Sequence, residues 1–261
     1  MVVLYLGDCL EKMKSVADKS VDLIICDLPF GCLIGGGISN PETAKKYKAQ
    51  GISSNTASGC SWDIKIDLVE FWNQIKRIRK NDHTPTLMFS TTKYGFDLYN
   101  SNPKEFRYDL VWDKQRGVSF LSANKMPMRS HEMIYVFSKA GANYNRIDIE
   151  GDYPISRRGK GTKPSNVYNT IPIYTKESPT DKRCALSVIT NQTKAIKGKH
   201  PTEKPIDLYK FLIERYSNSG DTVLDPTFGS GNSGLACNEL NRKYIGIEKD
   251  NNFFWKFVKK L

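Results

Sequence analysis

The chain has 261 residues, 39% hydrophobic and 26% charged, and carries a formal net charge of +11. This composition is that of a globular protein, and the length suits one α/β domain with an insertion. No apolar stretch approaches the roughly 20 residues of a membrane span and no basic leader precedes the first apolar run, so a soluble, cytoplasmic protein is expected. Three histidines and six cysteines without a Cys-x-x-Cys pair predict no metal site.

Short apolar runs alternate with helical patterns along the chain. The strands expected in order are 2–6, 23–26, 86–89, 110–112, 133–137, 223–224 and 244–247. Helices are expected over 68–78, where apolar residues recur at helical spacing, over 206–216, which follows Pro205, and over 234–240. Because the strands are continuous apolar runs separated by helices, they predict an open, mostly parallel α/β sheet that is covered on both faces.

Two stretches interrupt this alternation. Residues 31–62 are rich in glycine and serine and predict a long functional or mobile loop. Residues 141–199 are interpreted as an insertion; between 153 and 199 they hold ten lysines or arginines and two acids, a net charge of +8. The basic stretch is either a solvated surface or a phosphate-binding face.

A glycine turn follows the strand at 223–224. Gly229-Ser230-Gly231-Asn232-Ser233-Gly234 matches G-x-G-x-x-G, and Glu248 ends the next strand, where an acid can bind the hydroxyls of a ribose. A nicotinamide oxidoreductase is one interpretation. Against it, Asp225-Pro226-Thr227-Phe228 separates strand and glycines, and the 13 residues after Glu248 cannot form the second half of a dinucleotide fold. The sheet must therefore be completed by strands from the N-terminal part.

A second acid, proline and aromatic follow the strand at 23–26, in Asp27-Leu28-Pro29-Phe30. This tetrapeptide resembles the catalytic motif of DNA amino-methyltransferases, and the segment from Asp225 to Gly231 resembles their S-adenosylmethionine motif. The order, catalytic motif first, is similar to the beta class, as are His131-Glu132 and the segment His200-Pro201-Thr202-Glu203-Lys204-Pro205. The family more often has proline where this chain has Leu28, whose backbone carbonyl serves equally.

The resemblance implies a Rossmann-like, mostly parallel seven-stranded sheet with circularly permuted motifs. It divides the chain into a catalytic part (1–140, with loop 31–62), a target-recognition insertion (141–199) and a cofactor-binding part (200–261). Asp27, Leu28, Pro29 and Phe30 would be catalytic. The implied cofactor-binding residues are Asp8, Asp27, His200, Thr202, Lys204, Asp225, Phe228, Gly229, Ser230, Gly231, Asn232, Ser233 and Glu248. Positions expected to contact DNA are Arg157, Arg158, Lys160, Lys163, Lys182 and Arg183.

Structural roles compete with several of these assignments. Asp8 is also placed to cap a helix that begins at Cys9, Phe30 to join the core, and Lys204 to be solvated. In the catalytic interpretation, Asp27 and the Leu28 carbonyl accept the hydrogens of an exocyclic amine, and Phe30 stacks on a base extruded from the duplex. Transfer from the sulfonium then needs alignment and neither a metal nor a covalent intermediate.

The function implied is an S-adenosylmethionine-dependent DNA methyltransferase, bacterial or phage-encoded, that acts on adenine N6 in duplex DNA. Asp27 favours adenine, because the cytosine-N4 enzymes that resemble this family more often have serine there. Alternatives are an N4-cytosine methyltransferase, a nicotinamide (NAD) oxidoreductase, a non-catalytic nucleic-acid-binding module, and an enzyme that methylates RNA or protein. The resemblance leaves open a homodimer, a cognate restriction enzyme, and an orphan methyltransferase without one.

Overall fold

The structure, a computed structural model, describes residues 1–30, 64–118, 123–149, 184–190 and 203–261. The chain divides into two compact units. One contains Met1–Asn145 and Ser187–Leu261, and the other is Arg146–Leu186. In the described part of the second unit, the guanidinium of Arg146 donates to the carboxylate of Asp148 (2.7 Å). The fold below is that of the first unit.

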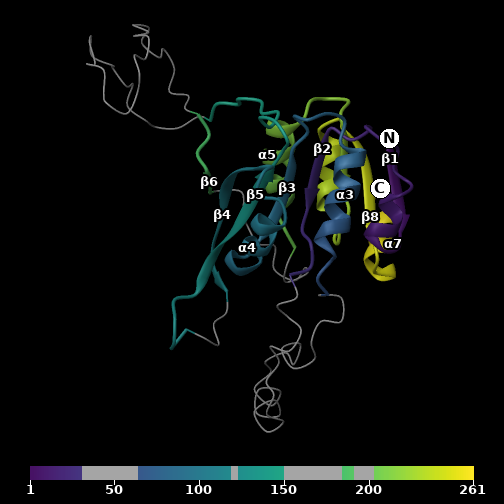
Figure 1. The fold of residues 1–261 in the computed structure, drawn as a ribbon. Helices are drawn as coiled ribbons and strands as arrows, with labels where there is room; N and C mark the ends of the chain where they lie inside the picture. The colour runs from purple at the N-terminus through teal and green to yellow at the C-terminus, as the bar shows by residue number, and fades with distance from the viewer. Residues whose placement is uncertain (31–63, 119–122, 150–183, 191–202) are drawn as a thin grey trace, which may run out of the picture. The chain divides into compact units, whose positions relative to one another are not determined.

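An eight-stranded sheet forms the centre of the first unit (Figure 1). In spatial order its strands are β1 (Val2–Leu6), β8 (Lys243–Glu248), β7 (Thr222–Asp225), β2 (Leu23–Cys26), β3 (Thr86–Ser90), β5 (Arg129–Phe137), β4 (Phe106–Val118) and β6 (Val188–Ile189). Every neighbouring pair is parallel except β3 with β5 and β5 with β4. The mostly parallel α/β sheet predicted from the sequence is therefore confirmed.

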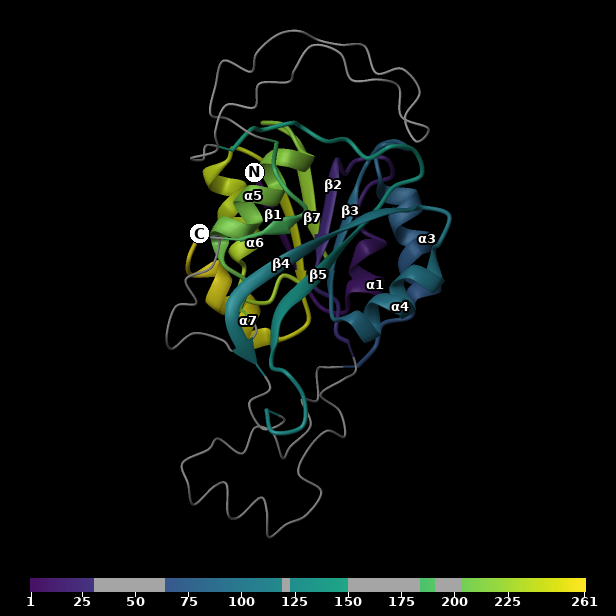
Figure 2. The ribbon, with the colours of Figure 1, turned by 90° about the vertical axis from the view of Figure 1, so that its left-hand side faces the viewer.

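Helices cover both faces of the sheet (Figure 2). One face carries α5 (Ile206–Tyr216), α6 (Asn232–Glu239) and α7 (Asn251–Val258), and the other carries α1 (Cys9–Met13), α3 (Leu68–Ile78) and α4 (Thr92–Ser101). Alternate residues of one strand enter opposite cores: Leu23 and Ile25 pack toward α5, and Ile24 and Cys26 toward α3. Strands buried on both faces must be continuously apolar, which is the pattern seen in the sequence.

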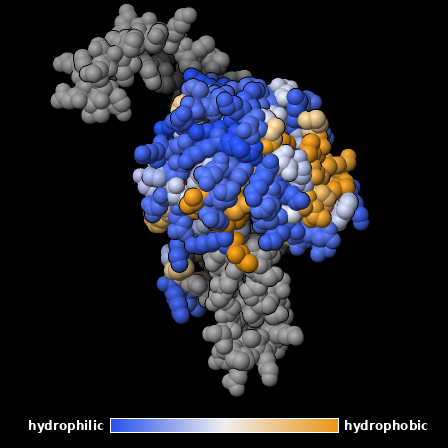
Figure 3. Space-filling view, turned by 45° about the vertical axis from the view of Figure 1, so that its right-hand side comes forward, coloured by the Kyte–Doolittle hydropathy of each residue, from blue (hydrophilic) through white to orange (hydrophobic). Residues whose placement is uncertain are grey.

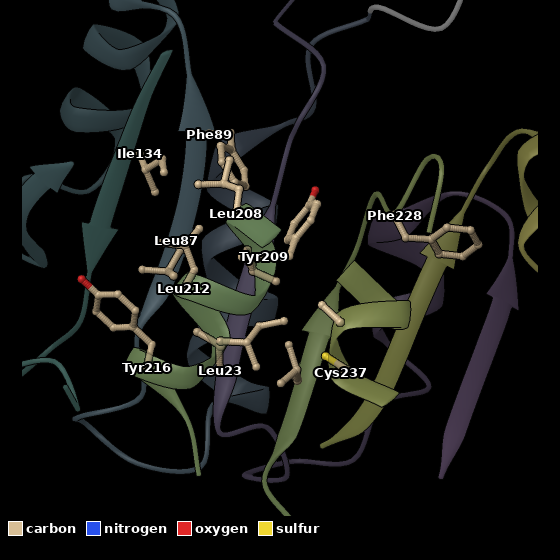
Figure 4. Close-up of a cluster of buried hydrophobic side chains, with 14 of the residues drawn as sticks. Leu23, Leu87, Phe89, Ile134, Leu208, Tyr209, Leu212, Tyr216, Phe228 and Cys237 are labelled. Carbon is tan, nitrogen blue, oxygen red and sulfur yellow. The ribbon is translucent and has the colours of Figure 1, made fainter. Parts of the chain in front are cut away.

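Helix α5 shows how the apolar pattern sets the packing. Leu208, Leu212 and Ile213 are fully buried, and the side chains of α5 point toward Leu23 and Leu87 of the central strands (Figure 4). Complete burial of each such side chain contributes roughly 1.5–3 kcal/mol. Because α5 follows directly on the segment with Lys204, this packing fixes that segment against the sheet.

The structure differs from the predicted elements in extent. Strands β4 and β5 reach well beyond 110–112 and 133–137. The sequence pattern did not reveal these extensions, because polar residues interrupt the apolar run at 107, 109 and 113–116 of β4 and make up 129–132 of β5. His131 and Glu132 consequently lie inside β5 rather than before it. Helix α6 begins at Asn232 instead of 234, and β6, within the predicted insertion, adds an eighth strand to the seven expected.

The surface of the described residues is mostly hydrophilic in the view of Figure 3, with separate apolar patches. Exposed apolar side chains include Val69 on α3 and Trp255 on α7. Within the part of the chain that the structure describes, no helix has the length and apolarity to cross a membrane.

Candidate active site

The two acid-proline-aromatic motifs meet at the centre of the sheet. Strands β2 and β7 are parallel neighbours, so Asp27 and Asp225 leave the sheet at the same edge. From β2 the chain passes through α3 on one face, and from β7 through α6 on the other face. Such a switch point opens a crevice at the carboxyl ends of the strands, where α/β proteins bind ligands. A hydrogen bond from Thr227 Oγ1 to the carbonyl of Asp27 (3.1 Å) joins the two motifs.

A pocket lies in this crevice. Its empty space, about 390 Å³, is partly open to solvent. The residues that line it come from both motifs and from the segments beside them: Asp27, Glu203, Lys204, Tyr209, Thr227, Phe228, Gly229, Ser230 and Phe253. Residues far apart in the sequence thus form one site, in which a carboxylate faces a glycine turn.

The Asp27 carboxylate is held on one side only. Its Oδ2 pairs with the ammonium of Lys204, whereas Oδ1 is buried and has no hydrogen-bond partner among the residues that the structure describes. Burial raises the pKa of Asp27 above its usual value, an effect that the Lys204 ammonium opposes and the nearby Glu132 carboxylate reinforces. A buried acceptor without a donor is costly, so Oδ1 is suited to accept a hydrogen from a ligand.

The glycine turn leaves room beside this carboxylate. Gly229 has φ +52 and Gly231 φ +80, the left-handed region that glycine adopts without strain. A Cβ on Gly229 would meet no atom of the described residues within 4 Å, and this glycine lines the pocket, so its missing side chain leaves space for a ligand. At Gly231 a Cβ would lie 2.0 Å from the ring of Phe257, so glycine there lets α6 begin close to α7.

Two further acids stabilise the turn. Asp225 is buried and accepts hydrogen bonds from Ser233 Oγ (2.6 Å) and Thr227 N (3.0 Å); burial nevertheless raises its pKa to about 7. Glu248, at the end of β8, accepts from the backbone N–H groups of Gly229 (2.8 Å) and Asp250 (2.7 Å). Its pKa is also raised, chiefly by burial. Side chains of β7, α6 and β8 therefore hold the turn in place through hydrogen bonds.

Comparison with known proteins identifies the family. Residues 21–259 match the model of a family described as DNA methylase. The chain belongs to this family. The match confirms the resemblance found in the motifs, and with it the class of enzyme, an S-adenosylmethionine-dependent DNA methyltransferase. The nicotinamide oxidoreductase is no longer an alternative for this methylase.

Curated relatives and solved structures agree with this assignment. The type II methyltransferase M.HinfI of Haemophilus influenzae is 27% identical over 98% of this chain and 67% of its own. The DNA adenine methyltransferase YhdJ of Escherichia coli is 28% identical over 98% and 81%. The methylase also has the fold of the PvuII cytosine-N4-specific DNA methyltransferase (TM-score 0.63, 16% identity, 98% and 85% covered) and of M1.HpyAVI in its SAM complex (0.58, 20%, all of both chains).

The methylase brings many of its predicted site residues together. Asp27, Lys204, Phe228, Gly229 and Ser230 line the pocket. Asp225, Ser233 and Glu248 make the hydrogen bonds that hold the glycine turn beside the pocket. Asn232 donates to Glu203 (2.9 Å) and to the carbonyl of Lys204 (2.8 Å). The open turn at Gly229 and the aromatic and polar side chains that line the pocket beside it are where we expect S-adenosylmethionine to bind.

Several predicted residues have structural roles instead of, or besides, the expected ones. Asp8 caps α1 by accepting from Leu10 N (3.0 Å), as the alternative interpretation held. Leu28 is 2% exposed and belongs to the core, which leaves only its backbone for a ligand. Phe30 packs against this core with its ring 5.2 Å from that of Tyr94.

Some predictions fall outside the described residues. These are the loop 31–62, His200 and Thr202 of the cofactor set, and the DNA set Arg157, Arg158, Lys160, Lys163, Lys182 and Arg183. Conversely, sequence reasoning missed Thr227, Tyr209 and Phe253 in the pocket wall. Phe253 follows Glu248 closely in the sequence, which is the one local signal that pointed to it.

Proposed function

We propose that this methylase transfers a methyl group from S-adenosylmethionine to the exocyclic N6 of adenine in duplex DNA. The observation that carries the proposal is the buried, unpartnered Oδ1 of Asp27 in a pocket bounded by the glycine turn. An exocyclic amine supplies the donor that this oxygen lacks, and the Leu28 carbonyl is the second acceptor. Both acceptors draw the amine toward tetrahedral geometry and free its lone pair.

The methyl donor contributes an electrophilic methyl group on a sulfonium. The amine nitrogen forms a bond to the methyl carbon while the carbon–sulfur bond breaks and its electron pair stays on sulfur. The nitrogen, now cationic, loses one proton to solvent. Asp27 contributes by binding and orienting the amine, and the pocket holds both reactants in line. Asp27 and the other residues that line the pocket come from one chain.

The target base has to leave the duplex to reach Asp27. Phe30 follows Asp27 closely and is partly exposed, and stacking on an aromatic ring contributes about 1–3 kcal/mol per base. The basic stretch between 153 and 199 would bind phosphates and so fix the register of the DNA. Replacement of Arg157 and Arg158 by Ala should weaken DNA binding similarly for all sequences and reduce its salt dependence.

A labelling experiment tests the proposal. The protein is incubated with S-adenosylmethionine labelled in the methyl group and mixed-sequence duplex DNA, and the DNA is digested to nucleosides. Label in N6-methyladenine is expected. Label in N4-methylcytosine would overturn the choice of base. RNA and protein acceptors are tested in parallel, and label in one of them but not in DNA would overturn the choice of DNA. No label in any acceptor would indicate a non-catalytic binding module.

A further inference from the structure

A series of side chains with alternating charge leads from Lys114 on β4 to Asp27. The Lys204 ammonium pairs with Asp27 Oδ2 and lies 3.5 Å from Glu132 Oε2 on β5, and the Lys114 ammonium on β4 pairs with Glu132 Oε1 (2.5 Å). The side chains are largely buried, at 28% exposed for Asp27, 4% for Lys204, 16% for Glu132 and 18% for Lys114. Two positive and two negative groups make this cluster neutral.

Lys204 has little freedom to leave its place. Its ammonium lies 4.6 Å from the centre of the Phe89 ring, and its backbone carbonyl accepts from Asn232 at the start of α6. Pro205 follows it as the N-cap residue of α5. Moving the ammonium would leave the buried Asp27 carboxylate without a counter-charge and Glu132 with Lys114 alone, which is strongly unfavourable. Lys204 is therefore a fixed partner of Asp27 and not a solvated side chain.

The consequence concerns the charge on Asp27. Two carboxylates in one buried site tend to share a proton, and a protonated Asp27 would be a poorer acceptor for an amine. The ionisable groups around it are Lys204, Glu132 and Lys114, with Asp225, Tyr209 and Cys26 beyond them. Lys204 and Lys114 favour the ionised carboxylate, whereas burial and Glu132 disfavour it.

We infer that Lys204 is a positioning residue: its contact with Oδ2 keeps the Asp27 carboxylate ionised and leaves Oδ1 free to bind the target amine. Glu132 holds Lys204 in place, and Lys114 in turn pairs with Glu132. This inference rests on the proposed function, because it assigns a task to Asp27 in that reaction. Lys204 was predicted to bind the cofactor; here its ammonium pairs with the catalytic carboxylate. Glu132 acts at one remove, since it touches Lys204 and not the amine.

Two substitutions, one that removes a positive charge near Asp27 and one that removes a negative charge, test the inference. The rate of methyl transfer at saturating substrates is measured from roughly pH 4, near the ordinary pKa of an aspartate, to roughly pH 9. In Lys204→Met the acidic limb of the profile should shift to higher pH, because Asp27 loses its counter-charge. In Glu132→Gln it should shift to lower pH, because a repelling charge is removed. Lys204→Arg should restore most of the wild-type profile.

A matched pair supplies the control. Lys210 on α5 pairs with Glu239 on α6, away from the pocket and partly exposed. Lys210→Met removes a positive charge and Glu239→Gln a negative charge, as in the test variants, and neither should shift the acidic limb of the pH profile. If Lys204→Met does not fold, as judged by its melting transition, Glu132→Gln and Lys204→Arg still decide. A limb that stays fixed in Glu132→Gln, or a Lys204→Met variant that is faster at its plateau, would overturn the inference.

A second measurement needs no activity. The Asp27 carboxyl carbon, assigned by comparison with Asp27→Asn, is titrated by NMR in ¹³C-labelled protein. Its midpoint should be higher in Lys204→Met and lower in Glu132→Gln than in the wild type. If the wild-type protein methylates no DNA, the proposed function fails, while this titration still decides whether Lys204 sets the charge of Asp27.

Discussion

The glycine turn offers the sharpest separation of folding from binding. Both Gly229 and Gly231 have positive φ, so alanine at either position costs about 1–2 kcal/mol of backbone strain. At Gly231 the added methyl group also meets Phe257, which is fully buried and cannot turn away; overpacking of this kind costs about 1–3 kcal/mol. Gly231→Ala should therefore lose about 2–5 kcal/mol of unfolding free energy, and Gly229→Ala only about 1–2.

Urea denaturation and calorimetric titration with S-adenosylmethionine measure the two effects. Gly229→Ala should keep most of its stability yet bind the cofactor more weakly, because its methyl group enters the pocket. Gly231→Ala combined with Phe257→Leu should lose less than the sum of the single changes, since the clash is shared. Equal stabilities of the two alanine variants, or strict additivity in the double variant, would refute the packing argument.

Three further changes have defined outcomes. Asp27→Asn should abolish methyl transfer in a protein that still folds, because the Lys204 ammonium keeps Glu132 as a counter-charge; residual turnover near the wild-type rate would contradict the role of Asp27. Glu105→Ala removes the partner of Arg79 in a buried ion pair (2.8 Å), and should cost about 3–5 kcal/mol by denaturation, whereas a loss below about 1 kcal/mol would show that the pair is solvated. The pKa of Asp225 is about 7 in the folded protein and about 3.9 in an unfolded chain. Between these pH values the folded state binds more protons than the unfolded state, so the free energy of unfolding should fall as the pH rises from about 4 to 7. Asp225→Asn should flatten this slope in melting curves, and an unchanged slope would contradict the assignment.

Local patterns in the sequence determined the elements and the two motifs. Continuous apolar runs predicted seven of the strands, because a strand covered on both faces has no polar position. The same reasoning underestimated β4 and β5, in which polar residues interrupt or precede the apolar run. Glycine and proline marked the turns at Asp27 and Gly229, since their backbone preferences act within a few residues. The family and its chemistry followed from these local signals.

Only the tertiary structure decided which charges meet. Lys204 and Asp27 are 177 residues apart in the sequence, and Glu132 and Lys114 come from β5 and β4, next to each other in the sheet. Side-chain pairing across a sheet depends on strand order and register, and neither is encoded in the local pattern of a single strand. The start of α6 was decided in the same way, by the approach of Gly231 to Phe257. The sequence thus specified the groups that do the chemistry, and the packing of distant segments specified their partners and their charge.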